Sequence, residues 1–280
     1  MDRSSLFVVI VPGRDDRAFY KRFFHYVARK LGFQLIDLDS RSYVEEKQTV
    51  LDRICKQHRR TMGVEESGEE GGVLRGTSVI RLLSTGTDRA VYVVIVPSER
   101  RVTQIASTIL GYQAGQEEPS IDFMVVADDA EERDFEEKLT SMYNSLRSAK
   151  HLDIGDEVSR GNYYRLYILK RPKDVRLMLF VQGLRDIRVV TKHAVEDYVL
   201  YLHEDMLNEI LGAVGRDLRD NMHKKLALAI ALRLCYTRIE ELFLQGLDDS
   251  RLGKLLQACD SLRTLAVAVV NALGTKRVSY

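Results

Sequence analysis

The sequence predicts an α/β fold in which a mostly parallel sheet, flanked by helices, is followed by a helical C-terminal domain. Residues 8–11, 93–96 and 123–126 are unbroken apolar runs rich in β-branched side chains. Such runs are typical of neighbouring interior strands that are buried on both faces. Segments with helical spacing separate the runs, as in parallel strands joined by right-handed crossovers. Beyond residue 192 the apolar residues recur only at helical spacing.

The first half of the chain alternates between strands and helices. Its first strand, residues 6–11, ends at Pro12 and Gly13, and residues 18–31 then carry aromatic and aliphatic side chains at helical spacing. The glycine- and glutamate-rich segment 63–72 resists burial, so we expect a mobile loop that proteases cut early. The other predicted elements are strands over residues 33–38, 79–83, 90–96 and 121–127 and helices over residues 43–58, 100–112 and 131–148.

The second half begins with two more strands, residues 163–169 and 175–181, whose short connector predicts a hairpin. Residues 252–273 carry a single apolar stripe, which predicts one helix. Residues 226–234 are apolar nearly all round, which predicts a central helix of a small bundle. We therefore expect an α/β domain over residues 1–150, an extension of the sheet or a linker over 151–191, and a helical bundle over 192–280.

Composition narrows the possible functions. The 280 residues suffice for one or two domains. The 42 Lys and Arg nearly cancel the 41 Asp and Glu, so only a local patch would attract nucleic acid. No targeting segment and no run of about 18 uncharged apolar residues is visible, which predicts a cytoplasmic protein without a membrane span.

The three cysteines lack zinc or disulfide spacing, and Cys235 and Cys259 lie in apolar helical stretches, where a thiol packs as a small hydrophobe.

One segment, Val8-Val-Ile-Val-Pro-Gly-Arg-Asp-Asp16, joins a buried strand to a helix, and a later strand ends in Asp128 and Asp129. Over about residues 6–150 this pattern resembles the Toprim domains of primases, type II topoisomerases and overcoming-lysogeny-defect nucleases. Residues 192–198 resemble a segment of archaeal Toprim-like proteins of unknown function. The resemblance implies a Toprim/Rossmann-like sheet with acidic residues at the strand ends.

The first acidic motif of that family is only partly present. It consists of a strand ending in Glu-Gly, two variable residues and Asp; here Gly13 and Asp16 fit the spacing, and Pro12 occupies the position of the glutamate. In the family the glutamate can exchange a proton with the reacting groups, and proline cannot. Asp15 and Glu99, which follow strands, are weak substitutes for it, so no catalytic residue is assignable.

The second motif, Asp-x-Asp after a later strand, matches at one position only. If Asp128 takes the first place, Ala130 takes the second; if Asp129 takes the second, Ala127 takes the first. Mg²⁺ prefers carboxylate oxygens. The resemblance therefore implies a Mg²⁺ site on Asp16, Asp128 and Asp129.

The same aspartates have a simpler interpretation. Asp15 and Asp16 precede one helix, and Asp128 and Asp129 precede another, so all four are candidates for helix N-caps. An N-cap typically contributes about 1 kcal/mol, whereas carboxylates that are only exposed at the strand ends contribute little to stability.

Clusters of basic residues are the candidate contacts for nucleic-acid phosphates. They are Lys56, Arg59, Arg60, Arg100, Arg101, Arg185, Arg188 and Lys192. The helical C-terminal domain is the candidate surface for a protein partner or for self-association.

Three functional hypotheses follow. The first is a degenerate Toprim-like protein that acts as a non-catalytic scaffold for nucleic acid or protein. The alternative is a Mg²⁺-dependent nuclease or phosphoryl-transfer enzyme acting on nucleic acid, and the second alternative is a Rossmann-like small-molecule binder. The chain has no Walker lysine after Gly13 and no Gly-x-Ser-x-Gly elbow, so neither ATP hydrolysis nor serine hydrolysis is indicated.

Overall fold

The computed structural model describes residues 5–32, 35–38, 78–84, 90–96, 101–113, 120–130, 134–149, 152–171, 174–184, 193–214 and 222–273. The loop expected over residues 63–72 and the helix expected over residues 43–58 lie outside the described residues.

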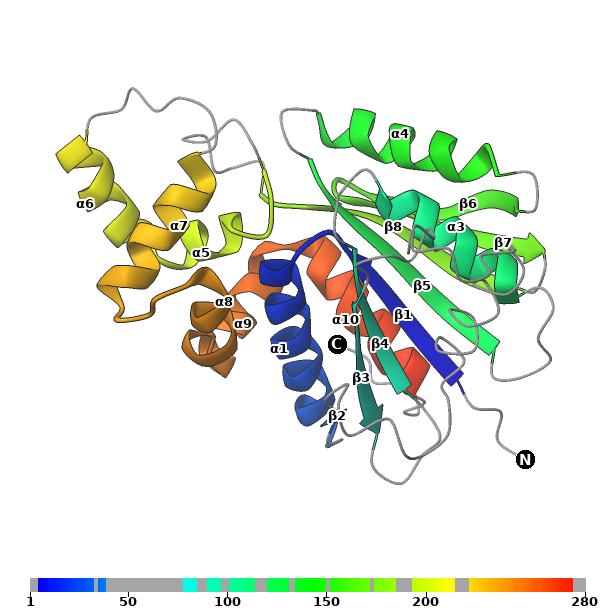
Figure 1. The fold of residues 1–280 in the computed structure, drawn as a ribbon, viewed down its shortest axis with the longest axis horizontal. Helices are drawn as coiled ribbons and strands as arrows, with labels where there is room; N and C mark the ends of the chain where they lie inside the picture. Colours follow the sequence, from blue (N-terminus) through cyan, green and yellow to red (C-terminus); the bar gives the residue numbers. More distant parts are fainter. Residues whose placement is uncertain are drawn as a thin grey trace, which may run out of the picture.

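One sheet of eight strands forms the centre of the molecule, in the order β2-β3-β4-β1-β5-β8-β7-β6 (Figure 1). The strands β4, β1, β5 and β8 run parallel to one another. On one side of this group β3 pairs with β4 and β2 with β3, and on the other side β7 pairs with β8 and β6 with β7, each pair in antiparallel orientation. The predicted α/β class is confirmed, and the sheet is mixed, with a parallel centre. The strands are β1 (Ser5–Val11), β2 (Leu35–Leu38), β3 (Ser78–Ser84), β4 (Ala90–Ile95), β5 (Ser120–Asp129), β6 (Asp153–Gly161), β7 (Tyr164–Arg171) and β8 (Val175–Gln182).

The three apolar runs are neighbouring interior parallel strands, as predicted. Strand β1 lies between β4 and β5, with Val9 opposite Val93 on one side and opposite Val125 on the other. All three valines are fully buried. A continuous apolar run suits this position because both faces of the central strands are covered.

The predicted hairpin also forms and continues the sheet. Strand β8 pairs with β5 in parallel and with β7 in antiparallel orientation. The edge strand β6 was not predicted. Its sequence is polar and most of its side chains are exposed or half-buried, so it lacks the alternation by which strands are recognised, although charged residues are common at sheet edges.

Helices cover both faces of the sheet (Figure 1). Val8 and Ile10 face the core under α3 and α4, whereas Phe7, Val9 and Val11 face the core shared by α1 and the C-terminal helices. This division follows from the alternation of side chains along a strand. The elements are α1 (Arg14–Lys30), α3 (Val102–Gln113), α4 (Phe135–Arg147), α5 (Asp197–Leu202), α6 (Glu204–Val214), α7 (Met222–Arg233), α8 (Ile239–Glu241), η3 (Leu242–Gly246), α9 (Asp249–Ala258) and α10 (Asp260–Leu273).

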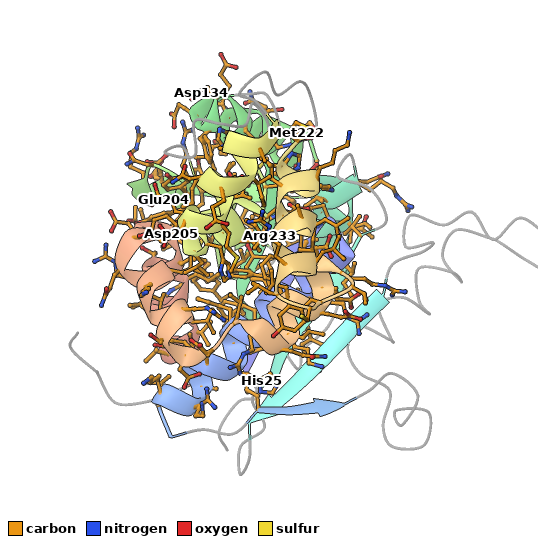
Figure 2. The ribbon with its side chains drawn as sticks, turned by 90° about the vertical axis from the view of Figure 1, so that its left-hand side faces the viewer. His25, Asp134, Glu204, Asp205, Met222 and Arg233 are labelled. Atoms are coloured by element: carbon orange, nitrogen blue, oxygen red, sulfur yellow. The ribbon has the colours of Figure 1, made fainter. Side chains whose placement is uncertain are left out.

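The C-terminal helices differ from the prediction in two places. The single helix expected over residues 252–273 is divided into α9 and α10 at Cys259, whose backbone is extended. Figure 2 shows α6, which begins at Glu204 and Asp205, beside α7, which runs from Met222 to Arg233. Helix α7 is not central, because Leu228 and Leu232 are 38% and 57% exposed. None of the described helices has the length and apolarity to cross a membrane.

Cys235 is not the buried apolar thiol that the sequence predicts. It is exposed and lies just after α7 with a φ of 67°. The amides of Cys235 and Tyr236 donate to the carbonyls of Leu232 and Ala231, as in a Schellman motif, where glycine is the preferred residue.

We therefore expect Cys235→Gly to raise the free energy of unfolding by about 0.5–1 kcal/mol, because it removes the steric cost of a β-carbon at positive φ. Urea denaturation measures this change. Cys235→Ala, which keeps the β-carbon, is the matched control and should give no gain. Equal effects of the two substitutions would show that the thiol, and not the backbone, sets the stability here.

Candidate functional site

The sequence-predicted aspartates lie at the edge of the sheet where the parallel strands β1, β5 and β8 end. Asp16 lies in the first turn of α1, Asp128 and Asp129 end β5, and Gln182 ends β8 directly opposite Asp129. Their exposed fractions are 6%, 5%, 6% and 0%, respectively. The expectation of exposed carboxylates at the strand ends is therefore wrong. Open α/β sheets bind ligands at this edge.

Asp16 and Asp129 converge on a single atom. The side-chain nitrogen Nε2 of Gln182 donates to Oδ1 of Asp16 at 2.5 Å and to Oδ1 of Asp129 at 2.9 Å. Both hydrogens of the amide are thus used on two carboxylates, one from α1 and one from the end of β5. The carbonyl oxygen Oε1 of the same amide is buried and has no hydrogen-bond partner among the described residues.

Asp128 points to the other face of the sheet. Its Oδ2 lies 2.8 Å from Nζ of Lys138 on α4, and its Oδ1 accepts the backbone N–H of Asp129 at 3.0 Å. Adjacent residues of a strand point to opposite faces. The structure therefore brings Asp16 and Asp129 together and places Asp128 in a buried ion pair with Lys138.

The capping interpretation is wrong for these aspartates. The N-cap of α1 is Gly13, and Asp15 and Asp16 lie inside the first turn. Helix α4 is capped by Asp134, whose side chain accepts the N–H of Glu136 at 2.8 Å. The carboxylates of Asp15 and Asp16 still lie at the positive end of the α1 dipole, which favours their charged form.

Three further residues of the site, His193, Glu196 and Asp197, were not proposed from the sequence. Glu196 and Asp197 are 2% and 0% exposed. Oδ2 of Asp197 accepts the backbone N–H of Leu184 at 2.9 Å and lies 2.8 Å from Nδ1 of His193. The carbonyl of His193 in turn accepts the N–H of Ala130 at 3.0 Å, which places this segment beside the end of β5.

In the sequence, only a family resemblance distinguishes residues 192–198, because charged residues at the start of a helix are normally solvated. The local signal is the pair Glu196 and Asp197, which stands immediately before the apolar run that begins at Tyr198.

Burial sets the electrostatics of the site. It raises the pKa of Glu196 from 4.5 to about 8, with a further contribution from the charge of Asp16, and the ammonium of Lys224 opposes the shift from 3.7 Å. Burial likewise raises the pKa of Asp16 from 3.8 to about 6, against the hydrogen bond from Gln182. The hydroxyl of Tyr20 has a pKa well above its usual value because of burial and the charges of Asp16 and Asp129. The carboxyl groups of Asp16 and Glu196 therefore hold their protons more tightly than carboxyl groups do in water, although the ammonium of Lys224 partly offsets the shift.

The donor set fits a hard cation such as Mg²⁺. Within the described ranges no three His, Cys, Asp or Glu side chains are grouped to hold a metal ion. Two convergent carboxylates nevertheless suffice for Mg²⁺, which commonly binds one or two carboxylates and completes its shell with water and substrate phosphates. Asp16 and Asp129 are the residues placed to supply them.

The remaining sequence-predicted residues are less informative. Pro12 is buried at the end of β1, and Asp15 is half-buried, with a pKa raised mainly by burial. Glu99 lies outside the described residues, as do all of the predicted basic contacts except Arg101, which is half-buried at the start of α3.

Comparisons with known proteins add no functional information. No family model and no curated protein matches the chain. Among solved structures, one match is the hypothetical protein SA1046 from S. aureus, with 12% identity over 65% of this chain and 94% of that one and a TM-score of 0.18. Another is a glyoxalase family protein from Enterococcus faecalis, with 11% identity over 64% and 95% and a TM-score of 0.15. Scores this low carry no argument about fold or function.

Proposed function

We propose that this chain is a degenerate Toprim-like protein that holds nucleic-acid phosphates through a divalent cation bound by Asp16 and Asp129, without cleaving the nucleic acid efficiently. The observation that carries the proposal is the convergence of these two buried carboxylates on one point at the carboxyl ends of the parallel strands. A bound Mg²⁺ would neutralise phosphate charge there.

The expected lack of catalysis follows from two features of the site. Pro12 has no group that can take or give a proton where the family has its glutamate, and general acid–base groups typically contribute about 10²–10⁴-fold to rate. The carboxylate of Asp128 is neutralised by Lys138 at 2.8 Å and faces away from Asp16. Only part of the family's acidic set is then available to a cation.

Nucleic acid is the partner that the resemblance implies, and a protein partner of the C-terminal helices is the alternative. The two are separated by dependence on the cation, since a phosphate held through Asp16 requires the metal and a contact made by the C-terminal helices does not.

The test is fluorescence anisotropy of labelled single-stranded DNA and RNA with the full chain, in Mg²⁺ or in EDTA. We expect binding that needs Mg²⁺ and that weakens at least about tenfold in Asp16→Asn, because one of the two carboxylate ligands is lost. Asp156→Asn, on the exposed edge strand β6, is the matched control and should bind as wild type does. Equal binding in Mg²⁺ and EDTA, or full binding by Asp16→Asn, would refute the cation-held phosphate.

A second candidate, a slow Mg²⁺-dependent nuclease, is favoured by one specific observation. Nδ1 of His193 is held by the buried carboxylate of Asp197 at 2.8 Å, beside the end of β5, which leaves Nε2 as the ring nitrogen for proton transfer. The test is nicking of supercoiled DNA by the same preparations. If the wild type nicks the DNA and both Asp16→Asn and His193→Gln do not, the nuclease is established over the non-catalytic protein.

A further inference from the structure

The amide of Gln182 is in an unusual state for a buried polar group. It is fully buried at the end of β8, and both of its hydrogens are donated to the carboxylates of Asp16 and Asp129. Its oxygen Oε1 has no partner within the described part of the chain. A buried acceptor without a hydrogen bond destabilises the fold, so the two charge-assisted bonds made by the nitrogen must outweigh this cost.

Chemistry dictates this orientation when nothing lies between the two carboxylates. An amide oxygen facing two carboxylate oxygens would be repelled by both, whereas the amide nitrogen is attracted. A divalent cation between Asp16 and Asp129 reverses the preference, because the cation repels N–H groups and binds amide oxygens. The oxygen and nitrogen of a carboxamide have nearly the same size, so rotation about one side-chain bond exchanges them without moving the backbone.

We infer that Gln182 is itself a cation ligand. Its carboxamide rotates by about 180° about its last side-chain bond when a divalent cation binds between Asp16 and Asp129. Nε2 faces the carboxylates without the cation, and Oε1 faces the cation with it. The inference rests on the cation site proposed above and adds to it a third oxygen ligand, supplied by β8. Two carboxylates and one amide oxygen leave further positions of a six-coordinate Mg²⁺ for water and phosphate.

A simpler role for Gln182 predicts the opposite result. If the amide only neutralises the two carboxylates, a cation must displace it, and removing the amide should tighten cation binding. If the amide is a ligand, its removal should weaken binding. The sign of the change therefore decides between the two roles.

The experiment is a titration of the full chain with Mn²⁺ alone. Binding is measured by isothermal titration calorimetry and by the decrease of the electron paramagnetic resonance signal of free Mn²⁺. We expect Gln182→Leu to weaken Mn²⁺ binding at least about tenfold. Gln257→Leu, on the exposed face of α9, is the matched control and should bind as wild type does. Asp16→Asn should weaken binding in every background.

Gln182→Glu keeps the inference testable if the leucine variant does not fold. It provides an oxygen ligand without an amide, so we expect Mn²⁺ to bind at least as tightly as to wild type. The variant should unfold at a lower temperature than wild type without Mn²⁺ and gain more from its addition, since three carboxylates then converge on one point.

The outcomes distinguish the ligand role of Gln182 from the proposed cation site on Asp16 and Asp129. A wild-type chain that does not bind Mn²⁺ would overturn both. Binding by the wild type that is unchanged or tighter in Gln182→Leu, or that is lost in Gln182→Glu, would overturn the ligand role of Gln182 and leave the site on Asp16 and Asp129 in place.

Discussion

Replacing Lys138 with methionine is expected to lower the free energy of unfolding by about 3–5 kcal/mol, because it leaves the buried carboxylate of Asp128 without its ammonium partner. The two side chains are 10% and 7% exposed and their charged atoms lie 2.8 Å apart. Methionine keeps most of the apolar stem of the lysine, so little of the loss arises from packing. Urea denaturation at neutral pH measures the change.

A second substitution and a surface control sharpen this prediction. Asp128→Asn in the Lys138→Met background removes the carboxylate charge that Lys138 neutralises and should restore much of the stability, which a double-mutant cycle reports as a coupling energy. Arg233 pairs with Glu209 at 2.7 Å on the exposed surfaces of α7 and α6, and Arg233→Met should cost no more than about 1 kcal/mol. If Lys138→Met lowers the free energy of unfolding as little as Arg233→Met does, the Lys138–Asp128 pair is solvated and not buried.

The second large effect concerns pH. We expect Glu196→Gln to stabilise the protein at pH 9 by about 3–5 kcal/mol and to have little effect at pH 4, because burial raises the pKa of Glu196 from 4.5 to about 8. The folded protein keeps the proton of Glu196 where the unfolded chain has released it. The wild type therefore loses stability as pH rises from about 4.5 to about 8, and glutamine, which is always uncharged, does not.

Urea denaturation at pH 4.5, 7 and 9 tests this. The difference between variant and wild type should grow with pH and level off above about pH 8. Asp16, whose pKa is raised to about 6, retains its own pH dependence in both proteins. Glu204→Gln, at an exposed position on α6, is the control and should follow wild type throughout. A difference that does not change with pH would show that Glu196 is not buried as a neutral acid.

The two predictions bear on function because both concern the edge that carries the proposed cation site. The Lys138–Asp128 pair decides which aspartate of β5 is available to a cation. Because the pKa of Asp16 is raised to about 6, a cation at the proposed site would displace a proton from Asp16 below about that pH. Metal titrations are therefore best made above that pH.

That the three central strands are interior neighbours could be predicted from the sequence because the signal is local. The runs at residues 8–11, 93–96 and 123–126 are each apolar without interruption, and only a sheet covered on both faces accommodates three such strands. The hairpin of β7 and β8 could be predicted because the connector between the two strands is short. The edge strand β6, the break at Cys259 and the exposed face of α7 were missed, since a polar edge, a local turn and one-sided burial have no distinct apolar period.

The sequence alone shows that acidic residues follow two of the central strands, namely Asp16, Asp128 and Asp129, and that Pro12, which has no titratable group, follows the first strand. How these residues are used depends on contacts between distant parts of the chain. Gln182 lies 166 positions from Asp16 and 53 from Asp129, and no local pattern links residues so far apart. The register of β5 decides which face of the sheet Asp128 and Asp129 each point to, because a shift by one residue would exchange their faces. The burial that raises the pKa of Glu196 likewise exists only when α5, which begins just after this residue, is packed against α1 and α7.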